Sequence, residues 1–112
     1  MNILHVEDDP MVAKAVYRHL AGPHDVFQAA TISEFETMWR AQEFDLVITD
    51  LELPGGTGFD IIERAQEDEV PCLVFSGATD KEEEVARTGV PFIDKLDIRE
   101  LMKCVDAVAS KR

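Results

Sequence analysis

Hydrophobic and polar residues alternate along the chain in one pattern that occurs five times, a short apolar run followed by a longer amphipathic stretch. The apolar runs are rich in Val, Ile, Leu and Phe, as parallel strands buried on both faces are. The longer stretches repeat apolar residues every three or four positions, which is typical of helices that bury one face. The predicted strands cover residues 2–6, 25–28, 44–49, 71–75 and 91–94.

Capping residues mark where the predicted helices begin and end. Asp9-Pro10 places an acidic cap before a proline in the first turn of the first helix. Gly22-Pro23 ends this helix and Gly89 ends the fourth. The other four helices open with Thr or Asp followed three residues later by Glu or Asp. This capping pattern begins at Thr31, Thr57, Thr79 and Asp97.

The strict alternation of strand and helix predicts the fold class. Right-handed crossovers between parallel strands place helices on both faces of the sheet, so we expect an α/β three-layer sandwich. A length of 112 residues suits one domain that spans residues 1–112. The chain is 46% hydrophobic and 30% charged, which is ordinary for a globular protein.

Charge and composition exclude several classes of partner. The net charge of −12 argues against contact with nucleic acid, whose phosphates need a basic surface. No apolar stretch approaches the length of a membrane span and no signal peptide precedes the first strand, so we expect no membrane contact. Cys72 and Cys104 lie outside any metal or redox motif, which favours a reducing compartment and predicts a cytoplasmic protein.

Chemically active side chains follow four of the predicted strands. Glu7 and Asp8 follow the first strand, Asp50 the third, Ser76 the fourth and Lys95 the fifth. Because the carboxyl ends of parallel strands meet at one edge of a sheet, these residues are expected to share one crevice. Carboxylates held close together need a cation or a shared proton. The crevice is therefore the predicted site.

The motifs around this crevice resemble those of the response regulator receiver domain, the flavodoxin-like module of two-component signalling. They run through the whole chain as Glu7-Asp8, Asp50-Leu51-Glu52-Leu53-Pro54, Gly58, Ser76-Gly77-Ala78 and Lys95. The resemblance implies a (βα)5 fold whose five-stranded parallel sheet has the order 2-1-3-4-5. It also implies that Asp50 accepts a phosphoryl group from a phosphohistidine on a sensor histidine kinase or phosphotransfer protein.

The resemblance implies a metal site for this reaction. Asp8 and Asp50 would bind Mg²⁺ directly, the backbone carbonyl of Glu52 would be a third ligand, and Glu7 would act through a water. Such an all-oxygen set suits Mg²⁺, with Mn²⁺ as a possible substitute.

The resemblance also implies a switch. Lys95 would pair with Asp50 before phosphorylation and with a phosphate oxygen afterwards, and Ser76 would move to hydrogen-bond the phosphoryl group. The ring of Phe92 would then turn inward and change the surface of the fourth helix, fifth strand and fifth helix. A downstream protein or a linked output domain would recognise that surface, and the domain itself would not be an enzyme beyond slow self-dephosphorylation.

Two features depart from the family pattern. Leu96 follows Lys95 where the family has a proline, so we expect an altered loop after the fifth strand. The segment between Ser76 and Lys95 is short, and its helix near residues 81–87 is polar because it carries Glu82-Glu83-Glu84. We expect a non-standard output surface, and a monomer or weak homodimer.

Two rival functions and several plainer roles accompany this interpretation. A pseudo-receiver that docks partners without phosphorylation remains open because of the altered loop and the short fourth helix. A phosphatase of the haloacid dehalogenase type is rejected, because its nucleophile follows the first strand and it needs a cap domain. Among individual residues, Asp9 is expected to cap a helix, His5 to be semi-buried, and Met38 and Trp39 to pack.

Overall fold

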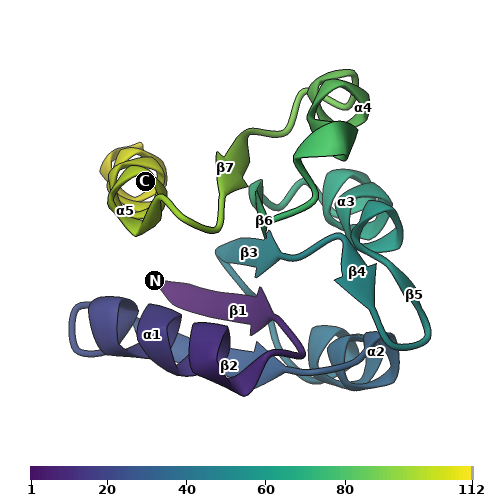
Figure 1. The fold of residues 1–112 in the computed structure, drawn as a ribbon. Coiled ribbons are helices and arrows are strands. Elements are labelled where there is room, and N and C mark those ends of the chain that lie inside the picture. The colour runs from purple at the N-terminus through teal and green to yellow at the C-terminus, as the bar shows by residue number, and fades with distance from the viewer. Residues whose placement is uncertain (112) are drawn as a thin grey trace.

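Five parallel strands form the central sheet of the computed structural model, which describes residues 1–111 (Figure 1). The strands are β1 (Asn2–Val6), β2 (Asp25–Ala29), β3 (Leu46–Thr49), β6 (Cys72–Ser76) and β7 (Phe92–Asp94). They pair in the order β2-β1-β3-β6-β7, which is the predicted order 2-1-3-4-5. The labels differ because a short antiparallel hairpin, β4 (Glu52–Leu53) and β5 (Gly56–Thr57), follows β3.

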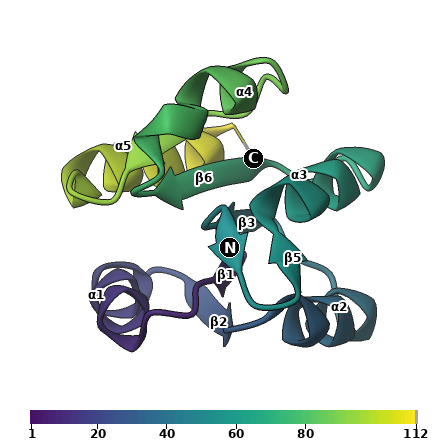
Figure 2. The same ribbon diagram turned by 45° about the vertical axis from the view of Figure 1, so that its right-hand side comes forward.

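Helices cover both faces of this sheet, as a three-layer sandwich requires (Figures 1 and 2). One face carries α1 (Pro10–Leu20) and α5 (Ile98–Ser110). The other face carries α2 (Ile32–Ala41), α3 (Gly58–Glu67) and the short α4 (Glu82–Ala86). None of the helices in residues 1–111 is long and apolar enough to cross a membrane.

Alternate residues of each strand supply the two hydrophobic cores. In β1, Leu4 and Val6 lie in the core beneath α2 and α3, whereas Ile3 lies in the core beneath α1 and α5. In β3, Val47 belongs to the first core and Ile48 to the second. Complete burial of one such side chain contributes about 2 kcal/mol, so the two cores are a main source of the stability of the sheet.

Four of the five predicted helix starts are confirmed. Asp9 Oδ1 accepts a hydrogen bond from the Met11 N–H at 2.9 Å, at the start of α1. Thr31, Thr57 and Asp97 cap α2, α3 and α5 in the same manner. The N-terminal ends of these helices are therefore set by short-range sequence signals.

The prediction that Thr79 caps the fourth helix is wrong. Thr79 is itself the first residue of a 3-10 turn, η1 (Thr79–Lys81), and α4 begins only at Glu82 without a side-chain cap. The Ala78 N–H is bound by Ser76 Oγ and the Thr79 N–H by the Gly77 carbonyl. The chain therefore already turns tightly before Thr79, and α4 is shortened to five residues.

Candidate functional site

The ends of four neighbouring strands bring the predicted site residues together at one edge of the sheet. Val6 of β1 pairs with Thr49 of β3, so the residues that follow them, Glu7 and Asp50, leave the sheet side by side. The Asp50 N–H donates to the Val6 carbonyl at 3.1 Å, which extends this pairing by one residue. On the other side, the Lys95 N–H donates to the Ser76 carbonyl at 3.2 Å.

Three carboxylates gather at this edge. Each of Glu7, Asp8 and Asp50 offers an oxygen atom within 4.8 Å of those of the other two. Glu7 and Asp50 are buried, with 4% and 6% of their surface exposed, whereas Asp8 is exposed. The group is made of oxygen atoms alone and opens to solvent on one side, so it fits Mg²⁺ or Mn²⁺ better than zinc.

Lys95 supplies the positive charge that these buried carboxylates need. Its Nζ lies 2.6 Å from Asp50 Oδ2, and 3.0 and 3.1 Å from the two oxygens of Glu7. Burial lowers the pKa of Lys95, but its hydrogen bonds to Asp50 and Glu7 outweigh this effect and raise the pKa overall. Lys95 is therefore a permanent cation at neutral pH.

The charged form of Glu7 is only partly stabilised in this arrangement. Burial raises the pKa of Glu7, and the hydrogen bonds from Lys95 and the Asp9 N–H offset only part of that rise. Its Oε1 has no hydrogen bond of good geometry within residues 1–111, although Lys95 Nζ is 3.0 Å away. One ammonium is thus shared between two buried carboxylates, and a further cation beside them would stabilise the charged form of Glu7.

The backbone around Asp50 fixes the direction of its carboxylate. Asp50 Oδ1 accepts a hydrogen bond from the Leu51 N–H at 2.7 Å, while Oδ2 faces Lys95. Gly58, at the start of α3, packs against the backbone behind it. A β-carbon at position 58 would lie 2.1 Å from the Asp50 carbonyl oxygen, so only glycine fits there.

A shallow pocket of about 350 Å³ opens beside the carboxylate of Asp50. Gly77 leaves it unobstructed, since nothing lies within 4 Å of where its β-carbon would stand. Ser76 is buried, and its hydroxyl accepts a hydrogen bond from the Ala78 N–H at 3.1 Å. Sequence reasoning missed one lining residue, Asp80, because it treated residues 79–82 only as a helix start. The full lining is Asp50, Glu52, Ser76, Gly77, Ala78, Asp80 and Lys95.

The remaining predicted residues lie outside the carboxylate group. Asp9 caps α1, as expected. Glu52 has an exposed side chain on β4 and reaches the pocket wall, separate from the three clustered carboxylates. Phe92 is half-buried at the start of β7 and packs against the core beneath α2 and α3.

The peptide bond between Lys95 and Leu96 is trans, as are all other peptide bonds of the described chain. The surface of Leu96 is 93% exposed. Its N–H donates to Asp94 Oδ1 at 2.9 Å.

His5 is more deeply buried than the sequence suggested, with 1% of its surface exposed. Its Nδ1 lies 3.4 Å from Gln28 Nε2, and its Nε2 has no partner within residues 1–111. Burial and, to a smaller extent, the Lys95 charge lower the pKa of His5, the Asp50 charge acts in the opposite direction, and together they bring the pKa to about 4. The ring is therefore neutral at pH 7.

Comparison with known proteins identifies a matching family and similar structures. Residues 3–105 match the family model of the response regulator receiver domain. The transcriptional regulatory protein MalR of Bacillus subtilis is 35% identical over 86 residues, which are 71% of this chain and 36% of MalR. The chain therefore spans about a third of the length of this curated relative.

Solved structures agree with this match. The non-phosphorylated HemR receiver domain of Leptospira biflexa has 32% identity and a TM-score of 0.83, over 96% of this chain and 92% of that domain. The response regulator TrrA of Thermotoga maritima, solved in complex with Mg²⁺ and BeF, has a TM-score of 0.86 at 19% identity, over 96% and 97% of the two chains, which shows a shared fold. From its sequence, its fold and the arrangement of its strand ends, the chain belongs to the response regulator receiver domain family.

Proposed function

We propose that this receiver domain accepts a phosphoryl group on Asp50 and thereby switches the surface formed by α4, β7 and α5. The observation that carries the proposal is the position of the Asp50 carboxylate, at the rim of an open pocket and 2.6 Å from the Lys95 ammonium. A carboxylate so placed is a nucleophile with a cation ready for the negative charge of the incoming group. The donor would be a phosphohistidine on a sensor histidine kinase or phosphotransfer protein.

In this reaction an oxygen of Asp50 attacks the phosphorus atom while the bond from phosphorus to the histidine nitrogen breaks. The departing nitrogen keeps the electron pair of that bond and takes a proton from water, and Asp50 becomes an acyl phosphate. The Leu51 N–H holds one carboxylate oxygen at 2.7 Å, so the direction of attack is set before the donor arrives. Lys95 then passes from the carboxylate to a phosphoryl oxygen.

Glu7, Asp8, Asp50 and the Glu52 carbonyl would hold Mg²⁺ or Mn²⁺, whose charge would offset that of the phosphoryl oxygens. Support for this comes from the carboxylate oxygens within 4.8 Å of one another and from the incomplete stabilisation of Glu7. Asp80 adds a further negative charge to the pocket wall and would slow the approach of anionic donors when no cation is bound.

The proposed switch rests on Ser76 and Phe92. The Ser76 hydroxyl accepts a hydrogen bond from the Ala78 N–H within its own turn. A phosphoryl group on Asp50 would give this hydroxyl a charged acceptor to which it could donate. Phe92 is half-buried, and its ring would turn inward once Ser76 has moved to the phosphoryl group. We propose that the altered surface is recognised by a linked output domain or a downstream protein in the cytoplasm, and that the domain signals without further catalysis.

Beryllofluoride tests the switch without a natural donor. Addition of beryllofluoride and Mg²⁺ to the isotope-labelled protein is expected to shift amide resonances from Asp50 through Ser76 to Phe92 and α4, and Asp50→Asn is expected to abolish these shifts. Shifts confined to the pocket would show that beryllofluoride binds without changing the surface of α4, β7 and α5. No shifts at all would favour a receiver-like docking module that works without phosphorylation.

A further inference from the structure

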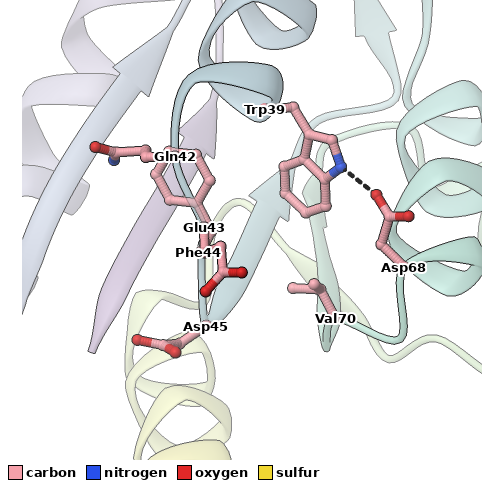
Figure 3. A pocket seen from close by; sticks show the side chains of 7 residues that line it. All are labelled: Trp39, Gln42, Glu43, Phe44, Asp45, Asp68 and Val70. Carbon is pink, nitrogen blue, oxygen red and sulfur yellow. Dashed lines mark hydrogen bonds between the residues drawn. The ribbon is translucent and has the colours of Figure 1, made fainter.

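A second pocket lies at the opposite edge of the sheet from the carboxylate group, where β3 and β6 begin (Figure 3). Trp39 comes from the last turns of α2, residues 42–45 connect α2 to β3, and Asp68 caps the end of α3. The pocket has a volume of about 320 Å³, at the small end of the range for ligand sites. Its lining residues are Trp39, Gln42, Glu43, Phe44, Asp45, Asp68 and Val70.

The wall of this pocket is a stack of aromatic rings. The Trp39 ring stacks on Phe35 at 5.2 Å and on Phe44 at 5.8 Å between ring centres. The indole N–H donates to Asp68 Oδ2 at 2.6 Å, which links α2 to the end of α3. The wall and the Asp68 carboxylate are therefore positioned before any ligand arrives, which reduces the ordering cost of binding.

The electrostatics of the pocket favour a cation. The carboxylates of Glu43 and Asp68 line it, together with Asp45, which already accepts the Asn2 N–H at 2.8 Å, and none of the lining residues is Lys, Arg or His. The helices α2 and α3 both end at the pocket, so the negative ends of both helix dipoles add to the carboxylate charges. Outside the lining, Arg64 lies 3.8 Å from Asp68, but it is held by Glu36 at 2.8 Å.

Glu43 is exposed and makes no hydrogen bond or ion pair within residues 1–111. Figure 3 shows Trp39 and Val70 between the loop carboxylates on one side and Asp68 on the other. An apolar wall flanked by acids on both sides matches a side chain with an apolar stem and a cationic, fork-shaped head. Arginine has this shape, and its planar head also lies well against aromatic rings.

We propose that this pocket binds an arginine side chain presented by a basic segment of a partner protein. The shape and charge of an arginine side chain are complementary to the pocket. The net charge of −12 on the chain also attracts basic partners. The pocket lies at the start of β3 and Asp50 at its end, so the arginine site and the phosphorylation pocket are available at the same time.

Trp39 is the only tryptophan among the 112 residues, so its indole resonance and fluorescence report on the pocket directly. The probe is a blocked peptide, acetyl-Arg-Gly-Arg-Gly-Arg-amide, titrated into the full chain at about 0.15 M salt, where long-range charge effects are screened. We expect the Trp39 indole N–H and the Glu43 amide to shift and saturate. The same peptide with citrulline in place of arginine keeps the shape without the charge and is expected not to bind.

The variant Glu43→Gln with Asp68→Asn is expected to weaken arginine-peptide binding about fivefold or more. Both replacements keep a side-chain oxygen, so Asp68→Asn retains an acceptor for the Trp39 N–H. A control with Glu82→Gln and Glu83→Gln on α4 removes the same charge elsewhere and is expected to change the affinity less than twofold. Equal weakening in both variants, equal binding of the citrulline peptide, or no indole shift in wild type would each overturn the proposal.

Discussion

The Lys95 ammonium nitrogen lies 2.6 Å from Asp50 Oδ2, although 45 positions separate the two residues in the sequence. The same nitrogen lies 3.0 and 3.1 Å from the two oxygens of Glu7. One positive charge therefore serves two buried carboxylates at the edge of the sheet. The Lys95 ammonium offsets part of the negative charge of the site, and a metal ion would reduce the excess that remains.

Replacing this lysine tests that balance. Lys95→Met keeps the apolar stem but leaves two buried carboxylates unpaired, so we expect the free energy of unfolding to fall by about 1–3 kcal/mol without metal. Mg²⁺ is expected to restore part of the loss, because it replaces the missing positive charge. Urea denaturation with and without Mg²⁺ measures both effects, and a variant as stable as wild type in both conditions would contradict this account of the site.

Gly58 is predicted to be intolerant of any side chain. In Gly58→Ala the new methyl group would stand 2.1 Å from the Asp50 carbonyl oxygen, so we expect the backbone to shift and the free energy of unfolding to fall by about 2 kcal/mol or more. Gly77→Ala is the matched control, because nothing lies within 4 Å of its added methyl group, and its effect on stability is expected to stay within about 0.5 kcal/mol. Thermal unfolding of the two variants compares them directly, and equal losses would show that the packing behind Asp50 is not the cause.

The burial of His5 is expected to make the free energy of unfolding depend on pH. Its pKa is lowered from the ordinary value of 6.5 to about 4, so between these values the unfolded chain binds a proton that the folded chain does not. This contribution is fully present above pH 6.5 and is lost as the pH falls toward 4, with a total loss of about 3 kcal/mol. His5→Leu removes the titrating group, so its stability is expected to fall less steeply over this range.

The control for this experiment is His19→Gln, an exposed histidine on α1 whose replacement is expected to leave the slope as in wild type. The raised pKa of Glu7 acts in the opposite direction, since its contribution is lost as the pH rises above its ordinary value. Comparing wild type with His5→Leu cancels the Glu7 contribution, which both proteins share. Parallel stability curves for the two proteins between pH 6.5 and 4 would rule out His5 as the source.

Leu96 is predicted not to impair the reach of Lys95. With leucine and a trans peptide at this position, Lys95 already lies 2.6 Å from Asp50, so Leu96→Pro is expected not to accelerate phosphorylation by acetyl phosphate. The proline would remove the N–H that donates to Asp94 Oδ1, which is expected to cost about 1 kcal/mol of stability. Rates of phosphorylation and urea denaturation on the same variant separate the two effects, and a faster rate would show that the leucine restricts the site.

The sequence predicted the elements that depend on short-range signals. Strand and helix order followed from the hydrophobic pattern, and Asp9, Thr31, Thr57 and Asp97 cap helices as their spacing indicated. The order of the strands came from the family resemblance, and the structure has the same order. The hairpin of β4 and β5 was missed because two-residue strands show no periodicity.

Two features of the structure were not predicted from the sequence. Thr79 carries a helix-start pattern, but the hydrogen bond of Ser76 to Ala78 turns the chain first, which also brings Asp80 to the pocket wall. Trp39 was predicted only to pack. Its role as the wall of an acidic pocket depends on the meeting of two helix ends that are far apart in the chain.

Intact mass measurement after incubation with acetyl phosphate and Mg²⁺ tests whether Asp50 accepts a phosphoryl group. Wild type is expected to gain the mass of one phosphoryl group, the gain is expected to require Mg²⁺, and Asp50→Asn is expected to show no gain. Unchanged mass in wild type, or the same gain in Asp50→Asn, would contradict the claim that Asp50 is the phosphoryl acceptor.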